Sequence, residues 1–200
     1  MLRRAVAEAV GTGLLIVAVV GSGIMATRLS PNDIGLQLLE NAIATGGALV
    51  ALILALGSVS GANFNPVVTW CEIVLDGRHK VAALAYTAVQ VVGACLGSIV
   101  ANVMFELDAI DFSSKARSSG ALWTSEVVAT AGLLLVIFGI VRSGKAAFVP
   151  FAVGAWITGA YFFTSSTSFA NPAMFIVMQV IGLGVAIALI KYLFPTKELS

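Results

Sequence analysis

The chain alternates long apolar runs with short polar segments, and six of the runs are long enough to cross a membrane. A membrane helix needs about 20 mostly apolar residues. Few polar residues inside the runs recur with the 3.6-residue period that gives a soluble helix its wet face, so lipid is the expected surrounding. The predicted spans are residues 5–25, 41–60, 81–105, 121–141, 146–164 and 173–194.

Composition supports an all-α integral membrane protein. Hydrophobic residues make up 59% of the chain and charged residues 10%, whereas soluble domains carry about 25% charged residues. The mean hydropathy is +1.01. A net charge of +1 gives no reason to expect nucleic acid or an acidic substrate as a partner. Membrane lipid is therefore the first expected partner.

The residue types that carry enzyme chemistry are sparse. Cys71 and Cys95 lie in or beside apolar runs and form no CxxC pair, and His79 stands alone in a basic loop. One histidine without cysteine or histidine neighbours makes a poor metal ligand set. The chain shows no nucleophile–base pattern and no phosphate-binding loop. We therefore expect no enzyme activity, no metal and no cofactor.

The basic residues predict the orientation of the spans. Cytoplasmic loops of membrane proteins carry an excess of Lys and Arg. Alternating the six spans places eight basic residues on one side and three on the other. The first set is Arg3, Arg4, Arg78, Lys80, Arg142, Lys145, Lys191 and Lys197, and the second is Arg28, Lys115 and Arg117. We expect a multi-pass protein of the plasma membrane or bacterial inner membrane, with both termini cytoplasmic.

Three features recur in the same order in the two halves of the chain. They are an acidic residue in the first span, an Asn-Pro pair after the second, and a glutamine in the third. The pairs are Glu8 and Glu126, Asn65-Pro66 and Asn171-Pro172, and Gln90 and Gln179. Three spans per half turn the second copy upside down, which gives an inverted 3+3 repeat. We expect a single domain over residues 1–200, with repeats 1–105 and 118–200.

Each Asn-Pro pair predicts the start of a helix. Asparagine is a good N-cap and proline is favoured at the first helical position. In an inverted repeat, two such re-entrant half-helices would point their N-termini at each other near the midplane. Each N-terminus carries about half a positive charge, which repels cations. The two Asn amides would offer hydrogen-bond donors to a water or alcohol oxygen.

The stretch Ser60-Gly61-Ala62-Asn63-Phe64-Asn65-Pro66-Val67-Val68-Thr69 resembles the first signature of the aquaporin and glycerol-facilitator (major intrinsic protein) family. Residues 168–173, which end in Asn171-Pro172-Ala173, resemble the second. Val67 stands where the family usually has alanine. The resemblance implies a passive channel with one pore per subunit of a homotetramer. It also implies that Glu8 and Glu126 brace the two Asn-Pro loops.

The resemblance further implies a selectivity filter at Thr45, Gly159, Ser168 and Met174. Water-selective members place a bulky aromatic residue, a histidine and an arginine among these positions. This chain has methionine at the arginine position and small residues at the other three. A wide filter without a fixed cation suits water together with larger neutral solutes such as glycerol, urea or neutral metalloid hydroxides.

The second half is shorter than the first. Between the Asn-Pro pair and the glutamine there are 25 positions in the first half (Asn65 to Gln90) and 8 in the second (Asn171 to Gln179), a deficit of 17. The second half-helix should therefore be shortened or missing. Either Asn171 lies displaced toward the outer surface, or one helix runs from Ala173 through the last span. The alternative function is a non-conducting family member with a structural or assembly role.

Overall fold

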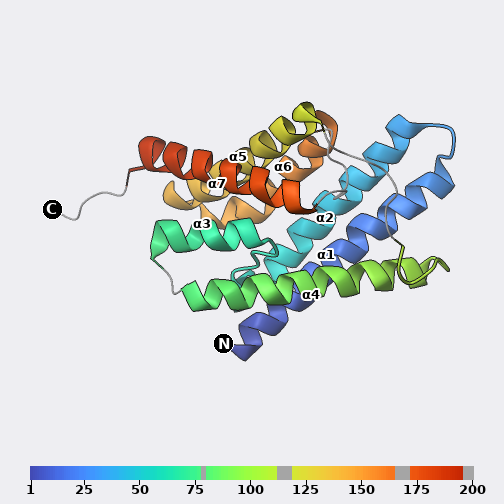
Figure 1. Cartoon of the computed structure of the whole chain (residues 1–200), viewed down its shortest axis with the longest axis horizontal. Helices are drawn as coiled ribbons and strands as arrows, with labels where there is room; N and C mark the ends of the chain where they lie inside the picture. Colours follow the sequence, from blue (N-terminus) through green and yellow to red (C-terminus); the bar gives the residue numbers. More distant parts are fainter. Residues whose placement is uncertain (78–79, 112–118, 165–171, 196–200) are drawn as a thin grey trace.

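The computed structural model describes residues 1–77, 80–111, 119–164 and 172–195, with the backbone alone for residues 80 and 172–176. Every regular element in these ranges is helical (Figure 1). In chain order the helices are α1 (Leu2–Leu29), α2 (Ile34–Ser60), α3 (Pro66–Asp76), α4 (Lys80–Met104), α5 (Gly120–Arg142), a short 3₁₀ turn η1 (Ala146–Phe148), α6 (Val149–Phe163) and α7 (Pro172–Leu193).

Each of the six predicted spans corresponds to a helix. Within the described residues, five helical segments are long and apolar enough to cross a membrane, and Val177–Leu193 forms a shorter apolar helix. The predicted start of the second span at residue 41 is too late. Asp33 caps α2 by accepting a hydrogen bond from the Leu36 backbone N–H at 2.9 Å, so the helix begins at Ile34. The first turns of α2 mix leucine with Gln37, Glu40 and Asn41, and these polar residues interrupt the apolar run on which the prediction rests.

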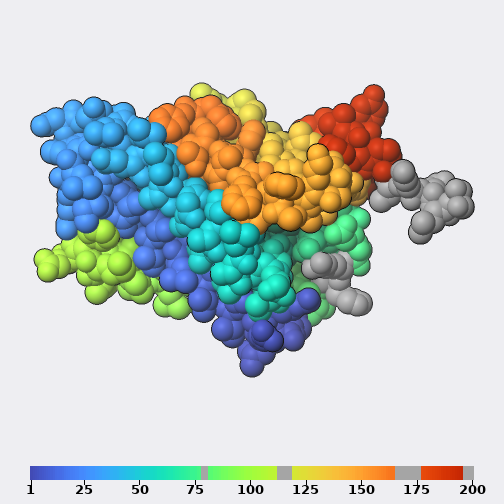
Figure 2. Space-filling model, turned by 180° about the vertical axis from the view of Figure 1, so that it is seen from behind, coloured from blue at the N-terminus to red at the C-terminus, as the bar shows by residue number. Residues whose placement is uncertain are grey.

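The helices form two halves with matching packing. In the first half α1 packs against α4 and α2, and in the second half α5 packs against α7 and α6. The halves meet where α2 packs against α6, and Figure 2 shows these two helices, in cyan and gold to orange, side by side. The predicted all-α fold with an inverted 3+3 repeat is confirmed.

The contact between α2 and α6 is reciprocal at one pair of glycines. A Cβ added at Gly154 would lie 2.8 Å from the Gly46 carbonyl oxygen, and a Cβ added at Gly46 would lie 3.0 Å from the Gly154 carbonyl oxygen. Small residues let membrane helices approach to backbone contact. An exchange in which each residue meets its counterpart is the pattern of a two-fold relation between like surfaces.

Helix α3 is the predicted re-entrant half-helix. It has 11 residues, which at 1.5 Å per residue span about 16 Å, or half of a 30 Å hydrocarbon core. It lies between α4 and α7 (Figure 1). Its buried face joins one apolar cluster with α5 and α7, formed by Val67, Val68, Cys71, Ala131, Leu134, Phe138, Ala186 and Ile190. Packing thus holds α3 inside the bundle.

Within the described residues, the second half has no counterpart of α3. Helix α7 runs unbroken for 22 residues from Pro172 to Leu193. The structure therefore shows one of the two arrangements expected from the 17-residue deficit, a single helix through the last span. The 8 positions from Asn171 to Gln179 are too few for a half-helix followed by a loop.

An arginine ties the ends of the paired helices together in each half. Arg28, at the end of α1, donates from Nη2 to the Phe105 carbonyl oxygen at 2.6 Å, just after α4. Arg142, at the end of α5, donates from Nη1 to the Phe194 carbonyl oxygen at 2.6 Å, just after α7. Both bonds satisfy a carbonyl at the end of a helix, where the helix itself supplies no partner.

Candidate functional site

Asn65 begins α3 as its N-cap. Its backbone is extended (φ −146°, ψ 125°), and Oδ1 accepts a hydrogen bond from the Val67 N–H at 2.8 Å. Pro66 occupies the first helical turn, where a missing N–H costs nothing. Among the described residues, none accepts a hydrogen bond from the Asn65 side-chain Nδ2. The cap therefore fixes the amide through its oxygen and leaves its two N–H donors for another molecule.

The loop before Asn65 is held in an unusual conformation. Gly61 has φ 100°, while Ala62 and Phe64 have φ values of 50° and 49°. A left-handed conformation costs a residue with a side chain about 1–2 kcal/mol. Such conformations persist where the surrounding structure over-determines them. Phe64 is also buried, with its ring packed against the open side of Gly11 on α1.

Hydrogen bonds to Glu8 of α1 fix much of this loop. The Glu8 side chain is 0% exposed. One carboxyl oxygen accepts from the Asn63 N–H at 3.1 Å, and the other accepts from the Phe64 N–H at 2.8 Å and from Gln90 Nε2 at 2.8 Å. The structure thus brings Glu8 and the loop of Asn65 together. A buried carboxyl group with three donors is well satisfied, as burial requires.

A second layer of polar side chains extends this network to α3 and α4. Gln90 of α4 is buried and also donates to Thr69 Oγ1 at 3.1 Å, and that hydroxyl donates to the Asn65 carbonyl oxygen at 3.2 Å. Asn63 Nδ2 lies 3.2 Å from both Thr69 Oγ1 and Glu72 Oε2. Sequence analysis used Gln90 only as a marker of the repeat and gave Thr69 no role.

The structure describes fewer of the predicted site residues in the second half of the chain. Glu126 lies on α5 and is 8% exposed. Asn171 and Ser168 lie outside the described residues, as does the loop that Glu126 was expected to brace. Pro172, Ala173 and Met174 form the first turn of α7, for which the backbone alone is described. The predicted meeting of the two Asn-Pro motifs therefore lies outside the described residues.

Two of the four filter positions are described beyond the backbone. Thr45 of α2 is 2% exposed, and its hydroxyl lies 3.0 Å from the Tyr161 hydroxyl of α6 and 3.3 Å from Asn41 Oδ1. Gly159 of α6 is exposed, and a Cβ there would meet nothing closer than the Phe163 ring at 4.0 Å. Tyr161 is not among the residues predicted from the sequence. Its signal was a hydroxyl inside an apolar span, which needs a partner when buried.

Comparison with known proteins agrees with the geometry. The major intrinsic protein family matches residues 1–158. The chain is 51% identical over 173 residues to aquaglyceroporin AqpS of Rhizobium meliloti, covering 86% of this chain and 73% of that protein. It is 31% identical over 170 residues to aquaporin Z of Photorhabdus laumondii, covering 77% of this chain and 72% of that protein.

The fold is also similar to that of a solved structure. The aquaglyceroporin from Plasmodium falciparum superposes with a TM-score of 0.75 and 16% sequence identity, over 98% of this chain and 96% of that chain. The family match covers α1 to α5 and most of α6, including the loop of Asn65 and its partner Glu8. This chain is a multi-pass membrane protein that belongs to the major intrinsic protein family, whose members are channels rather than enzymes.

Proposed function

We propose that this protein is a passive channel for water and small uncharged solutes, with glycerol, urea and neutral metalloid hydroxides as the solute class. The free Nδ2 donors of Asn65 carry the proposal. An alcohol or water oxygen can accept from them, while the oxygen of the same amide is already committed to the cap of α3. An uncharged N–H donor fixed in this way can bind the oxygen atom of a neutral solute.

The dipole of α3 supports exclusion of cations. The N-terminus of a helix carries about half a positive charge, and Asn65 sits on that N-terminus. A positive helix end lining a pore raises an electrostatic barrier to cations, including protons. The network of Glu8, Gln90 and Thr69 keeps this helix end in place.

The filter positions support passage of solutes larger than water. Gly159 adds no side chain, and the space beside its Cα is open. The hydroxyls of Thr45 and Tyr161 are bonded to each other and add a polar pair of modest size between α2 and α6. We extend the filter to Ser168 and Met174 and assign Glu126 the second brace, by analogy with the first half.

The alternative of a non-conducting member finds no support in the comparisons, since the relatives are named as aquaporins and aquaglyceroporins. A homotetramer and cytoplasmic termini remain part of the proposal. The family resemblance supports the first, and the division of eight basic residues against three supports the second.

A substitution at Gly159 tests the filter. Gly159→Phe in proteoliposomes should abolish glycerol uptake while reducing water flux less, because a ring narrows the path for the larger solute first. Stopped-flow light scattering with water, urea and glycerol measures the three fluxes. Gly184→Phe on α7 is the matched control, since its Cβ also meets open space. Equal loss for all solutes, or no loss, would refute the filter assignment.

A further inference from the structure

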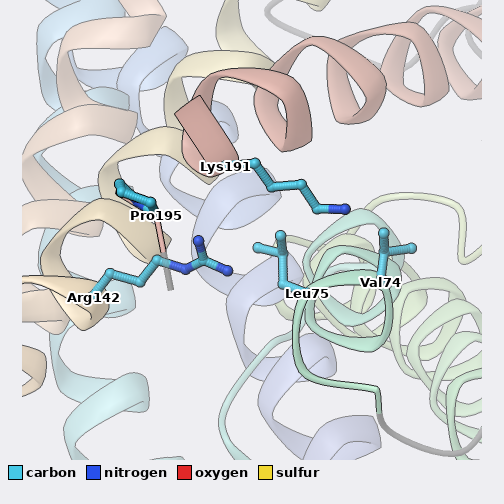
Figure 3. Close-up of a pocket in the computed structure, with 5 residues that line it drawn as sticks. All are labelled: Val74, Leu75, Arg142, Lys191 and Pro195. Carbon is cyan, nitrogen blue, oxygen red and sulfur yellow. The ribbon is translucent and has the colours of Figure 1, made fainter. Parts of the chain in front are cut away.

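A cavity of about 450 Å³ opens between the ends of three helices, far from Asn65 (Figure 3). Its lining comes from the last turns of α3, α5 and α7 and from Pro195, two residues beyond the end of α7. The lining residues are Val74, Leu75, Arg142, Lys191 and Pro195. Val74 lies about 13 Å from Asn65 along the axis of α3, at 1.5 Å per residue. The cavity is therefore separate from the proposed pore donor.

Two cations from different helices face this space. Figure 3 shows the side chains of Arg142 and Lys191 extending into the gap between α7 and α3. Arg142 donates one hydrogen bond to the Phe194 carbonyl oxygen. Among the described residues, neither cation pairs with a carboxylate. The two like charges repel each other and attract an anion, and their full charges act against the partial negative charge of the helix C-termini that end here.

The remaining walls are apolar. Val74 and Leu75 of α3 face the two cations across the cavity, and Pro195 lies beside Arg142 (Figure 3). The helix ends around it are those at which α5 and α7 leave the predicted spans, so the cavity lies at the membrane surface. Basic pockets between membrane helices at that depth suit lipid head groups. Arginine binds a phosphate group through two parallel N–H donors, and lysine acts as a point charge beside it.

We propose that this cavity binds a phosphate group, carried either by an anionic phospholipid or by a soluble phosphate anion. Arg142 and Lys191 are its ligands. The site is independent of conduction and so extends the protein beyond the proposed channel function. Occupancy would neutralise the two cations and tie the ends of α3, α5 and α7 together.

The test uses the purified full-length protein and three probes. Native mass spectrometry measures the binding of phosphatidylglycerol and of the zwitterionic phosphatidylcholine, and thermal unfolding in detergent measures stabilisation by inorganic phosphate. Lys191→Gln is the cleanest variant, because the Lys191 side chain makes no hydrogen bond to a described residue. We expect it to weaken anion binding about fivefold, the usual factor for one basic residue near a membrane surface.

Two control variants separate binding from stability and from general charge. Arg142→Gln removes both a ligand and the bond to Phe194, whereas Arg28→Gln removes the equivalent bond in the first half together with the stacking of its guanidinium over the Phe105 ring. Lys145→Gln removes a cation just beyond the end of α5 that does not line the cavity. We expect Arg142→Gln and Lys191→Gln to lose binding, while Arg28→Gln and Lys145→Gln keep it.

The outcomes distinguish the sources of the phosphate. Preferential retention of phosphatidylglycerol that Lys191→Gln reduces assigns the site to a lipid head group. Saturable stabilisation by inorganic phosphate without a lipid preference, again lost in Lys191→Gln, assigns it to a soluble anion. If neither probe binds, or if Lys145→Gln weakens binding as much as Lys191→Gln, the proposal is wrong.

Discussion

At the scale of single residues, the Glu8 carboxyl group is the centre of the site. It accepts three hydrogen bonds, two of them from loop N–H groups. Glu8→Gln replaces one acceptor oxygen with an NH₂ group. A buried donor then faces another N–H donor, and the hydrogen bond between them is lost. We expect the substitution to cost about 1–3 kcal/mol of stability and to lower glycerol flux. Thermal unfolding in detergent and stopped-flow uptake measure the two effects.

The control for this substitution is Glu106→Gln. Glu106 is exposed in the turn after α4, where loss of a charge should change stability by less than about 0.5 kcal/mol. If Glu8→Gln behaves like Glu106→Gln, the carboxyl group does not hold the loop.

Residue roles could be predicted where the chemistry is local. Asn65 followed by Pro66 predicts a helix start without further information, and Glu8 stands out as an acidic residue inside an apolar span. The hydrogen bonds between Gln90 and Glu8 and between Tyr161 and Thr45 join residues that lie 82 and 116 positions apart in the chain. No spacing rule reveals such pairs, because helix packing alone creates them.

At the scale of helices, close contact between α2 and α6 joins the two halves. Gly154→Ala would place its Cβ 2.6 Å from Val50 Cγ2 and 2.8 Å from the Gly46 carbonyl oxygen. Because the Gly46 oxygen belongs to the α2 backbone and cannot move without separating the helices, we expect a loss of about 1–3 kcal/mol. Thermal unfolding of the reconstituted protein measures it.

Gly47→Ala is the matched control for that contact. Gly47 is the neighbour of Gly46 on α2, but a Cβ there would meet no atom within 4 Å. Stability should be unchanged or slightly raised, since alanine favours a helix over glycine. Equal destabilisation by both variants would show that the reciprocal glycine contact is unimportant.

The helices themselves could be predicted well from the sequence, since an apolar run of membrane length has few other interpretations. The predicted helix boundaries are wrong where a polar cap extends a helix beyond its apolar run, as Asp33 does for α2. The unbroken α7 is one of the two arrangements that the short spacing after Asn171 predicts. The bonds of Arg28 and Arg142 to carbonyl oxygens were not foreseen, because both arginines were read only as markers of orientation.

At the scale of the whole molecule, the asymmetry of the two halves matters most. An inverted repeat with two opposed half-helices sets two positive helix ends against each other at the midplane. Within the described residues, this chain builds only α3 as a half-helix, and α7 runs continuously through the second half. We therefore expect a weaker barrier, so that a proton-sensitive dye inside proteoliposomes should report a measurable proton leak. Full proton exclusion would contradict this expectation.

Solute flux through proteoliposomes tests the central claim most directly, with the native protein and Asn65→Asp compared against protein-free vesicles. The native protein should raise glycerol uptake well above the lipid background without conducting K⁺. Asn65→Asp should lower glycerol uptake and admit K⁺, because it sets a negative charge on the positive end of α3. Native glycerol uptake no faster than that of protein-free vesicles, or an Asn65→Asp variant with native glycerol flux and native K⁺ exclusion, would contradict a pore at this site.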